Sequence, residues 1–427
     1  MNRRMFLAAM AGAAVAQTAA LPNVVVIVSD DHGYGDASCN ENHGADVSTP
    51  NIDRIAAMGV RFRQGYASCY VCAPTRAGLM TGRYQQRYGF YTASDSRAGL
   101  PLSETTLADL LRGRGYATAV FGKWHLGLEE AYHPLSRGFE KFYGFLGHGA
   151  HDYFALKASD GHNAIYRDRK TIDDTGYLTD NLAREASAFI EQNRTKPFFL
   201  YLPFNAVHSP MQAPEADVAR FGGSGKPRNV LLAMLSRMDA AVGKVLDTLE
   251  RHKLTERTLL FFLSDNGGAK ANSSFNGVLR GFKQSVYEGG IRVPFLAAWP
   301  GKMPTGKVVD EPVISMDVFA TACEAAGVKL PEGRVYDGRS VLGLVNGKSR
   351  APLHEALYWD ADEGRRAVRV GDWKLVDNEG VVELFDLARD VGEKMNLAAK
   401  HPEKVKELQA RFAAWRKEMK PRIRRKG

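Results

Sequence analysis

Two short apolar runs constrain the fold of this chain most strongly. They cover residues 23–28 and 259–263, and their composition is typical of strands buried on both faces of a parallel sheet. Both runs end alike, because Ser29-Asp30-Asp31 follows the first and Ser264-Asp265-Asn266 follows the second. An amphipathic helical pattern over residues 231–249 precedes the second run, as in an α/β fold. We therefore expect a sheet whose carboxyl edge carries acidic side chains.

The side chains that follow these two strands form a candidate metal site. They supply three carboxylates and one amide oxygen, from Asp30, Asp31, Asp265 and Asn266. This donor set, without an extra cysteine or histidine, suits a hard divalent cation such as Ca²⁺ or Mg²⁺ better than zinc. Asp-Gly and Asn-Gly sequences after strands are also common as plain turns. The matched pair of endings favours the metal site.

A third segment, Cys72-Ala73-Pro74-Thr75-Arg76, is typical of a loop that leads into a short helix. Pro74 suits the first turn of a helix, because its missing N–H costs nothing there. Cys72 would lie at the positive end of the helix dipole, with Arg76 one turn away. This setting favours a bound anion or an acidified thiolate. The alternative is a buried structural thiol at the start of a helix.

Two further strand ends carry candidate bases and cations. Residues 118–121 precede Lys123 and His125, and an extended segment would point these two side chains to one side. Residues 198–202 precede His208. A single histidine is usually structural. Here, however, both histidines follow strands that would end at the same edge of the sheet.

Taken together, these motifs resemble the type I sulfatases of the alkaline phosphatase-like superfamily. The segment that begins at Cys72 resembles the signature in which this cysteine is oxidised to Cα-formylglycine. Residues 122–127 and 208–210 resemble the family's "GKWHLG" and "H-x-P" signatures, and residues 279–294 resemble its lysine and EGG-x-R-x-P block. The resemblance implies a large, mostly parallel sheet sandwiched by helices. It also implies a smaller carboxyl-terminal subdomain made of an antiparallel sheet and a helix.

The resemblance further implies a role for each candidate residue. The metal ligands would be Asp30, Asp31, Asp265, Asn266 and the modified Cys72, with Ca²⁺ as the expected ion and Mg²⁺ as the alternative. Lys123, His208 and Lys283 would bind the oxygens of the sulfate ester. The alternative for Lys283 is an ordinary solvent-exposed lysine in a loop. The hydrated aldehyde at position 72 would attack sulfur, Arg76 would stabilise it, and His125 and His208 would act as catalytic proton carriers. A formylglycine-generating or sulfatase-maturing enzyme would be a partner.

The first 20 residues resemble an export signal. Arg3 and Arg4 precede an apolar segment that is too short to span a membrane comfortably. The arginine pair is also similar to a twin-arginine signal. We expect a periplasmic or secreted protein with no stable membrane span, and an uncleaved anchor is the alternative.

The rest of the chain divides into two parts by its sequence pattern. We expect residues 21–346 to form a catalytic domain and residues 347–427 to form the small subdomain. In the latter, residues 367–376 and 381–385 indicate two strands joined by a turn, and residues 402–419 indicate a polar helix.

Net charge narrows the class of binding partner, and the cysteine count argues against a disulfide-based fold. The 427 residues carry a formal net charge of +9, which favours a polyanion such as a sulfated glycan but also suits a plain solvated basic surface. We recognise no nucleic-acid-binding module. Four cysteines do not make a disulfide framework at this length. Residues 138–166 either shape a sugar pocket or are incidental, and they include His148, His151, Asp152 and Tyr153.

The sequence leaves three candidate functions. The favoured one is a sulfuric ester hydrolase that removes sulfate from a sulfated carbohydrate. A phosphomonoester or phosphonate-ester hydrolase of the same superfamily is one alternative, because a hard metal beside cations also suits phosphoryl transfer. A non-catalytic lectin for sulfated polysaccharide is the other, expected if Cys72 is never oxidised.

Overall fold

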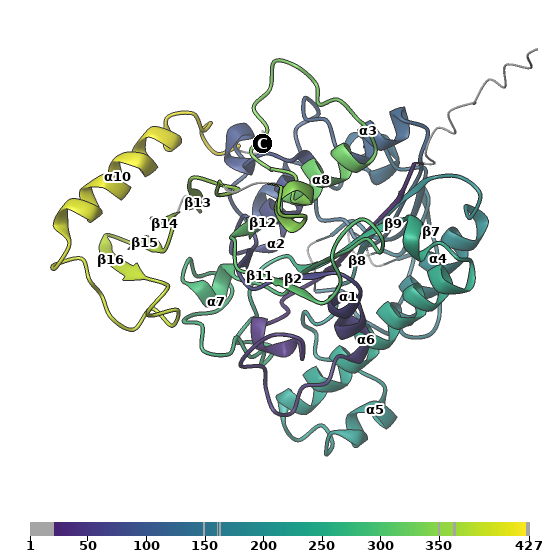
Figure 1. Ribbon diagram of the computed structural model, residues 1–427. Helices are drawn as coiled ribbons and strands as arrows, with labels where there is room; N and C mark the ends of the chain where they lie inside the picture. The colour runs from purple at the N-terminus through teal and green to yellow at the C-terminus, as the bar shows by residue number, and fades with distance from the viewer. Residues whose placement is uncertain are drawn as a thin grey trace, which may run out of the picture.

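The computed structural model describes residues 21–147, 150–159, 161, 164–348, 351–361 and 364–423. The expected export signal at residues 1–20 lies outside the described residues. Within the described ranges, no helix has the length and apolar character needed to cross a membrane. A large sheet with helices on both faces forms the main body, and a smaller sheet with helix α10 stands to one side (Figure 1).

The large sheet has a parallel centre. Among the described residues it contains ten strands, in the order β11-β2-β10-β9-β1-β8-β4-β5-β6-β7. The five parallel central strands are β9 (Thr258–Ser264), β1 (Asn23–Ser29), β8 (Phe198–Pro203), β4 (Ala117–Lys123) and β5 (Lys141–Phe145). Antiparallel pairs occur toward both edges, which comprise β11 (Lys307–Val309), β2 (Val60–Phe62), β10 (Phe295–Ala298), β6 (Tyr166–Arg167) and β7 (Lys170–Thr171). The expected α/β class is confirmed.

Helices cover both faces of this sheet, which explains why its central strands are continuously apolar. Val25 and Ile27 of β1 face the core under α1 (Pro50–Met58), α4 (Leu178–Gln192) and α6 (Pro227–Arg251). Val24, Val26 and Val28 face the opposite core, under α2 (Cys72–Thr81), α3 (Leu107–Gly113) and α8 (Asp317–Ala325). The remaining short elements are β3 (Gly65–Tyr66), β12 (Val313–Ile314), α5 (Glu215–Arg220), α7 (Glu288–Ile291) and α9 (Leu342–Val345).

The register of the central strands brings three loops to one edge. Ser29 of β1 lies opposite Ser264 of β9, and Val28 lies opposite Pro203 of β8. Backbone hydrogen bonds continue past the strand ends, because the Asp30 N–H donates to the Ala206 carbonyl at 2.9 Å and the Asp265 N–H donates to Ser29 at 3.1 Å. The polar segments after β1, β8 and β9 therefore leave the sheet side by side.

The smaller sheet is antiparallel and is packed against a helix. Its strands are β13 (Leu357–Asp360), β14 (Arg365–Val370), β15 (Trp373–Asn378) and β16 (Val381–Asp386), and α10 (Pro402–Arg416) covers one face. The expectation of one strand over residues 367–376 is wrong. Gly371 has a φ of 56° and turns the chain between β14 and β15. The domain boundaries at residues 20 and 346 stay predictions.

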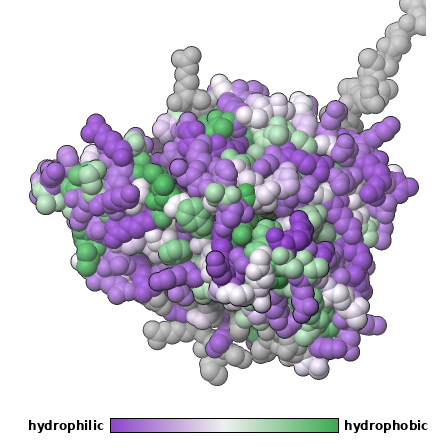
Figure 2. Space-filling model, turned by 90° about the horizontal axis from the view of Figure 1, so that it is seen from below, coloured by the Kyte–Doolittle hydropathy of each residue, from purple (hydrophilic) through white to green (hydrophobic). Residues whose placement is uncertain are grey.

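The surface seen from below is mostly hydrophilic, with small hydrophobic patches between the polar residues (Figure 2). Large exposed apolar side chains on the described surface include Phe154, Phe275 and Phe282. Single exposed apolar residues are normal on a globular protein. The main apolar content therefore lies in the cores around the two sheets.

A buried ion cluster joins the small sheet to the main body. The Nζ of Lys374 in β15 lies 2.8 Å from a carboxylate oxygen of Glu288 and 2.9 Å from one of Glu393, and all three side chains are buried. Burial, reinforced by the Glu288 charge, raises the pKa of Glu393 to about 7, although Lys374 opposes the shift. The hydroxyl of Tyr66 in β3 donates to Glu288 at 2.7 Å. One lysine charge therefore contacts two carboxylates at this junction, and Arg292 adds a second cation 3.4 Å from Glu288.

We expect Lys374→Met to lower the free energy of unfolding by about 3–5 kcal/mol, because two carboxylates then stay buried without their shared cation. Urea denaturation followed by tryptophan fluorescence measures the loss. The exposed Lys400 offers a matched control, and Lys400→Met should change stability by less than about 0.5 kcal/mol. Equal, small effects of both substitutions would contradict the structural importance of the cluster.

Candidate functional site

Four acidic or amide side chains meet at the carboxyl edge of the large sheet. Asp30, Asp31, Asp265 and Asn266 are all buried. Ligand-type atoms of Asp30, Asp265 and Cys72 lie within 4.8 Å of one another, as do those of Asp30, Asp31 and His208. The Nδ2 of Asn266 donates to Oδ1 of Asp31 at 2.8 Å. The structure thus brings together all five residues that the sequence analysis grouped around a metal.

Each of the three carboxylates has its own cation. The Nζ of Lys123, at the end of β4, lies 2.5 Å from Oδ2 of Asp30. The Nζ of Lys283, in the loop before α7, lies 2.7 Å from Oδ1 of Asp31. The guanidinium of Arg76 in α2 binds Oδ2 of Asp265 through Nε and Nη2, at 2.9 and 2.7 Å. Three positive side chains therefore balance three negative ones in a nearly dry site.

The charges shift the acidity of the two innermost carboxylates in opposite directions. Burial alone would raise the pKa of Asp30, but the charges of Lys123, His208, Arg76 and Lys283 outweigh burial and hold this pKa well below its usual range. Burial and the nearby Asp30 charge raise the pKa of Asp265 to about 6. Asp30 is the carboxylate around which the cations gather.

Cys72 begins α2, as expected from the sequence. Val71 before it is extended, and Gly82 ends the helix with a left-handed φ of 67°. The expectation of an acidified thiolate is wrong: burial raises the pKa of the Cys72 thiol, although Lys123 and Lys283 act in the opposite direction. Desolvation of the thiolate outweighs the attraction of these two cations.

The two candidate histidines lie at the ends of neighbouring strands. His208 follows β8, and its Nε2 lies 3.6 Å from Oδ2 of Asp31. Its Nδ1 lies 2.7 Å from the Ser209 carbonyl, which can only accept, so Nδ1 carries a proton and Nε2 faces the carboxylates. His125 is buried two residues after β4 and has a φ of 59°. The condition of an extended segment from Lys123 to His125 is not met throughout, because the backbone turns at His125.

A brace for the His208 loop is the part that sequence reasoning missed. The hydroxyl of Tyr153 lies 2.8 Å from the carbonyls of both Asn205 and His208. The Tyr153 N–H donates to Oε1 of Gln212 at 2.9 Å, and Nε2 of Gln212 donates to Asp152 at 2.8 Å. No local pattern marks these contacts, because they join residues more than 50 positions apart.

The brace bears on residues 138–166, which either shape a sugar pocket or are incidental. His151 and Tyr153 have no exposed surface, so their side chains do not line an open pocket. The Nδ1 of His151 lies 2.5 Å from the Asp152 carbonyl, and its ring packs on Phe145. Asp152 is partly exposed but is bound to Gln212. His148 lies outside the described residues.

Three buried oxygens in the cluster have no hydrogen-bond donor among the described residues. They are Oδ1 of Asp30, Oδ1 of Asp265 and Oδ1 of Asn266. A buried polar atom without a partner costs about 1–3 kcal/mol, so native proteins rarely retain three together. Carboxylate and amide oxygens are the donors that hard divalent cations prefer. The donor set therefore fits a metal ion.

Two family models match this chain. The Sulfatase model covers residues 22–328, and the model described as N-sulphoglucosamine sulphohydrolase, C-terminal, covers residues 281–420. The chain belongs to the sulfatase family. This sulfatase is thus a member of the alkaline phosphatase-like superfamily, and it is an enzyme that hydrolyses sulfate esters.

Curated relatives and solved structures agree with this family assignment. Steryl-sulfatase of Mus musculus is 35% identical and covers 82% of this chain and 69% of its own length. Arylsulfatase of Hemicentrotus pulcherrimus is 34% identical, with coverage of 83% and 67%. The structure of Ps i-CgsB in complex with k-i-k-neocarrahexaose has a TM-score of 0.87 at 33% identity and covers 94% of both chains. The phosphonate monoester hydrolase of Agrobacterium radiobacter shares the fold, with a TM-score of 0.66 at 21% identity.

We expect Tyr153→Phe to loosen the His208 loop, because two backbone carbonyls lose a hydroxyl donor at a cost of about 1–3 kcal/mol. Hydrogen exchange of the Val207 and His208 amides should accelerate, and mass spectrometry of peptides from this loop measures it. Tyr116 is equally buried, and its hydroxyl has no hydrogen-bond partner in the described part of the chain. Tyr116→Phe is therefore the control, and an identical exchange pattern in both variants would argue against the brace.

Proposed function

We propose that this sulfatase removes sulfate from a sulfated carbohydrate and that Cys72, oxidised to Cα-formylglycine, carries the nucleophile. The observation that carries the proposal is the meeting of Cys72 with two carboxylates within 4.8 Å, surrounded by Lys123, Lys283 and Arg76. The similar protein Ps i-CgsB was solved in complex with the oligosaccharide k-i-k-neocarrahexaose, which supports a sugar substrate here. The net charge of +9 is in keeping with an anionic polymer.

The oxidised side chain would supply what a thiol lacks. As a hydrate it offers one hydroxyl to attack sulfur, which displaces the alcohol and leaves sulfate bound to the side chain. Loss of the proton from the second hydroxyl would then re-form the aldehyde and break the carbon–oxygen bond to sulfate. Arg76 lies one helical turn after Cys72 and would orient this group with its buried charge. The segment from Cys72 to Arg76 resembles the target of a formylglycine-generating or sulfatase-maturing enzyme, which we propose as a partner. The export-like residues 1–20 support a periplasmic or secreted location.

Ca²⁺ is the metal that we propose for this site. Asp30, Asp31, Asp265 and Asn266 would hold it together with the modified Cys72, and three of their oxygens lack another partner among the described residues. A cage of several protein oxygens suits Ca²⁺ better than Mg²⁺, which usually keeps most of its waters. When bound, the ion would supply positive charge to the sulfuryl oxygens.

The charge balance explains how the site would favour the transition state. The three carboxylates are already balanced by three side-chain cations, so a divalent ion makes the site net positive. This excess matches the negative charge that spreads over the sulfuryl oxygens as the ester bond breaks. Lys123 would bind these oxygens, and Lys283 with His208 would lie near the bridging oxygen and help it leave as an alcohol. His125 would accept the proton when sulfate is released.

We expect Cys72→Ala to abolish hydrolysis of an aryl sulfate while leaving the unfolding temperature nearly unchanged. The matched control is Cys69→Ala, because Cys69 is equally buried but lies outside the motif; it should keep most of the activity. Peptide mass analysis of the segment around Cys72, after native expression, tests for the aldehyde directly.

Two outcomes would contradict this proposal. Substantial turnover by Cys72→Ala would exclude a nucleophile at position 72. Faster hydrolysis of aryl phosphate than of aryl sulfate by the wild-type enzyme would instead favour a phosphate ester as the substrate.

We expect Ca²⁺ to stabilise the chelator-treated protein by about 2.7 kcal/mol at 100 times its dissociation constant. Asp265→Asn should remove this gain, because it converts one buried carboxylate into an amide. Differential scanning calorimetry with and without Ca²⁺ measures the shift without requiring activity. The surface variant Asp247→Asn is the control and should keep the full shift. A larger stabilisation by Mg²⁺ than by Ca²⁺ at the same ion concentration would overturn the choice of ion.

A further inference from the structure

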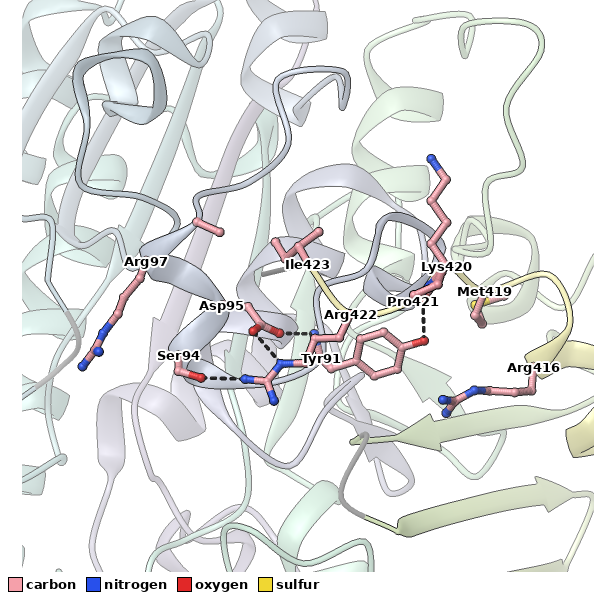
Figure 3. A pocket seen from close by; sticks show the side chains of 11 residues that line it. Tyr91, Ser94, Asp95, Arg97, Arg416, Met419, Lys420, Pro421, Arg422 and Ile423 are labelled. Carbon is pink, nitrogen blue, oxygen red and sulfur yellow. Dashed lines mark hydrogen bonds and ion pairs between the residues drawn. The ribbon is translucent and has the colours of Figure 1, made fainter. Parts of the chain in front are cut away.

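A second cavity lies where the carboxyl-terminal tail crosses the main body (Figure 3). Its volume is about 870 Å³, which is within the range of ligand-binding pockets. One wall is the segment around η3 (Ala93–Arg97), and the other is formed by residues 416–423, at and after the end of α10. Neither wall contains a residue of the sulfate site described above.

The cavity is built on an ordered network of hydrogen bonds. Nε of Arg422 donates to Oδ1 of Asp95, and its Nη2 donates to the hydroxyls of Thr92 and Ser94, each at 2.8 Å. The other oxygen of Asp95 accepts the backbone N–H of Tyr91 at 2.7 Å. These contacts fix the tail against η3, so the cavity keeps its shape without a ligand.

The lining carries an excess of positive charge. It contains one carboxylate, Asp95, and four cations, which are Arg97, Arg416, Lys420 and Arg422. Asp95 is used by Arg422, and Arg416 pairs with Asp360 while its guanidinium lies 5.4 Å from the centre of the Tyr91 ring. Arg97 and Lys420 have no ion-pair partner among the described residues and are exposed. A negatively charged ligand would therefore find uncompensated cations at this cavity.

The cavity is close to the Cys72 loop. The Sγ of Cys69 lies 3.8 Å from the Tyr91 carbonyl. Cys69 precedes Cys72 by three residues, so their Cα atoms are at most about 11 Å apart. With the length of the Cys69 side chain and this contact added, the Tyr91 carbonyl lies within about 18 Å of the Cys72 Cα atom. The Tyr91 side of the cavity is thus within the span of a short sugar chain whose sulfate occupies the catalytic site, and the exposed Arg97 and Lys420 belong to the same lining.

We propose that this cavity is a subsite for a second sulfate group, carried by a sugar next to the one that is cut. The inference rests on the proposed function, because it takes the sulfated carbohydrate as the substrate. Arginine fits sulfate well, since its planar N–H groups match pairs of sulfate oxygens. The subsite would make the enzyme prefer chains with more than one sulfate over an isolated sulfated sugar.

Calorimetric binding of a short dextran sulfate to the Cys72→Ala protein tests the subsite without turnover. We expect Arg97→Glu/Lys420→Glu to weaken this binding about tenfold relative to the parent. The control is Lys196→Glu/Arg251→Glu, which makes the same change in net charge at exposed positions before β8 and β9, on the opposite edge of the sheet. Neutral dextran should not bind measurably to any of these proteins.

A second measurement connects the cavity to the catalytic site. Dextran sulfate should inhibit aryl sulfate hydrolysis by the wild-type enzyme competitively, and the Arg97→Glu/Lys420→Glu enzyme should need about ten times more of it. Equal weakening of binding in both double variants, or inhibition that is not competitive, would overturn the subsite. A wild-type enzyme that releases sulfate neither from sulfated oligosaccharides nor from an aryl sulfate would refute the proposed function, whereas the calorimetric comparison would still decide whether the cavity binds sulfated sugar.

Discussion

The burial of three carboxylates at one edge of the sheet is the constraint on which the rest of the structure depends. Asp30, Asp31 and Asp265 are at most 3% exposed, and a buried charge without a partner is costly. Their cations come from three separate segments: helix α2, the end of β4 and the loop before α7. These segments must therefore converge on one edge, because displacement of any of them would leave a charge unpaired in a dry site.

The same charges determine the register of the central strands. Strand β1 is apolar on both faces, so its hydrophobic pattern alone would tolerate a shift of one residue against its neighbours. Such a shift would carry Asp30 between β8 and β9, away from Lys123, and would break its backbone bond to Ala206. The polar ends of the strands therefore supply the registration that the valine-rich centre lacks, and the site and the fold are specified together.

The sequence predicted what depends on local pattern and missed what depends on distant contacts. Four central strands and the start of α2 follow from apolar runs and from proline chemistry, and the residues gathered around Asp30 follow from polar strand ends. The left-handed turn at His125 and the turn at Gly371 break extended patterns, and only the surrounding packing selects them. The Tyr153 brace joins segments far apart in the chain, so it leaves no local signal. The roles assigned to the site residues stay predictions.

The two groups of cations in this protein differ in how freely they can change. Lys123 and Lys283 each neutralise a buried carboxylate, so their loss would cost stability as well as chemistry. Arg97 and Lys420 are exposed and have no ion-pair partner in the described part of the chain, so their replacement costs the fold little. Under the proposed function, the charges that cleave the ester are therefore fixed by the fold. The charges that read the neighbouring sugar are free to vary with the substrate, and specificity can change without rebuilding the catalytic edge.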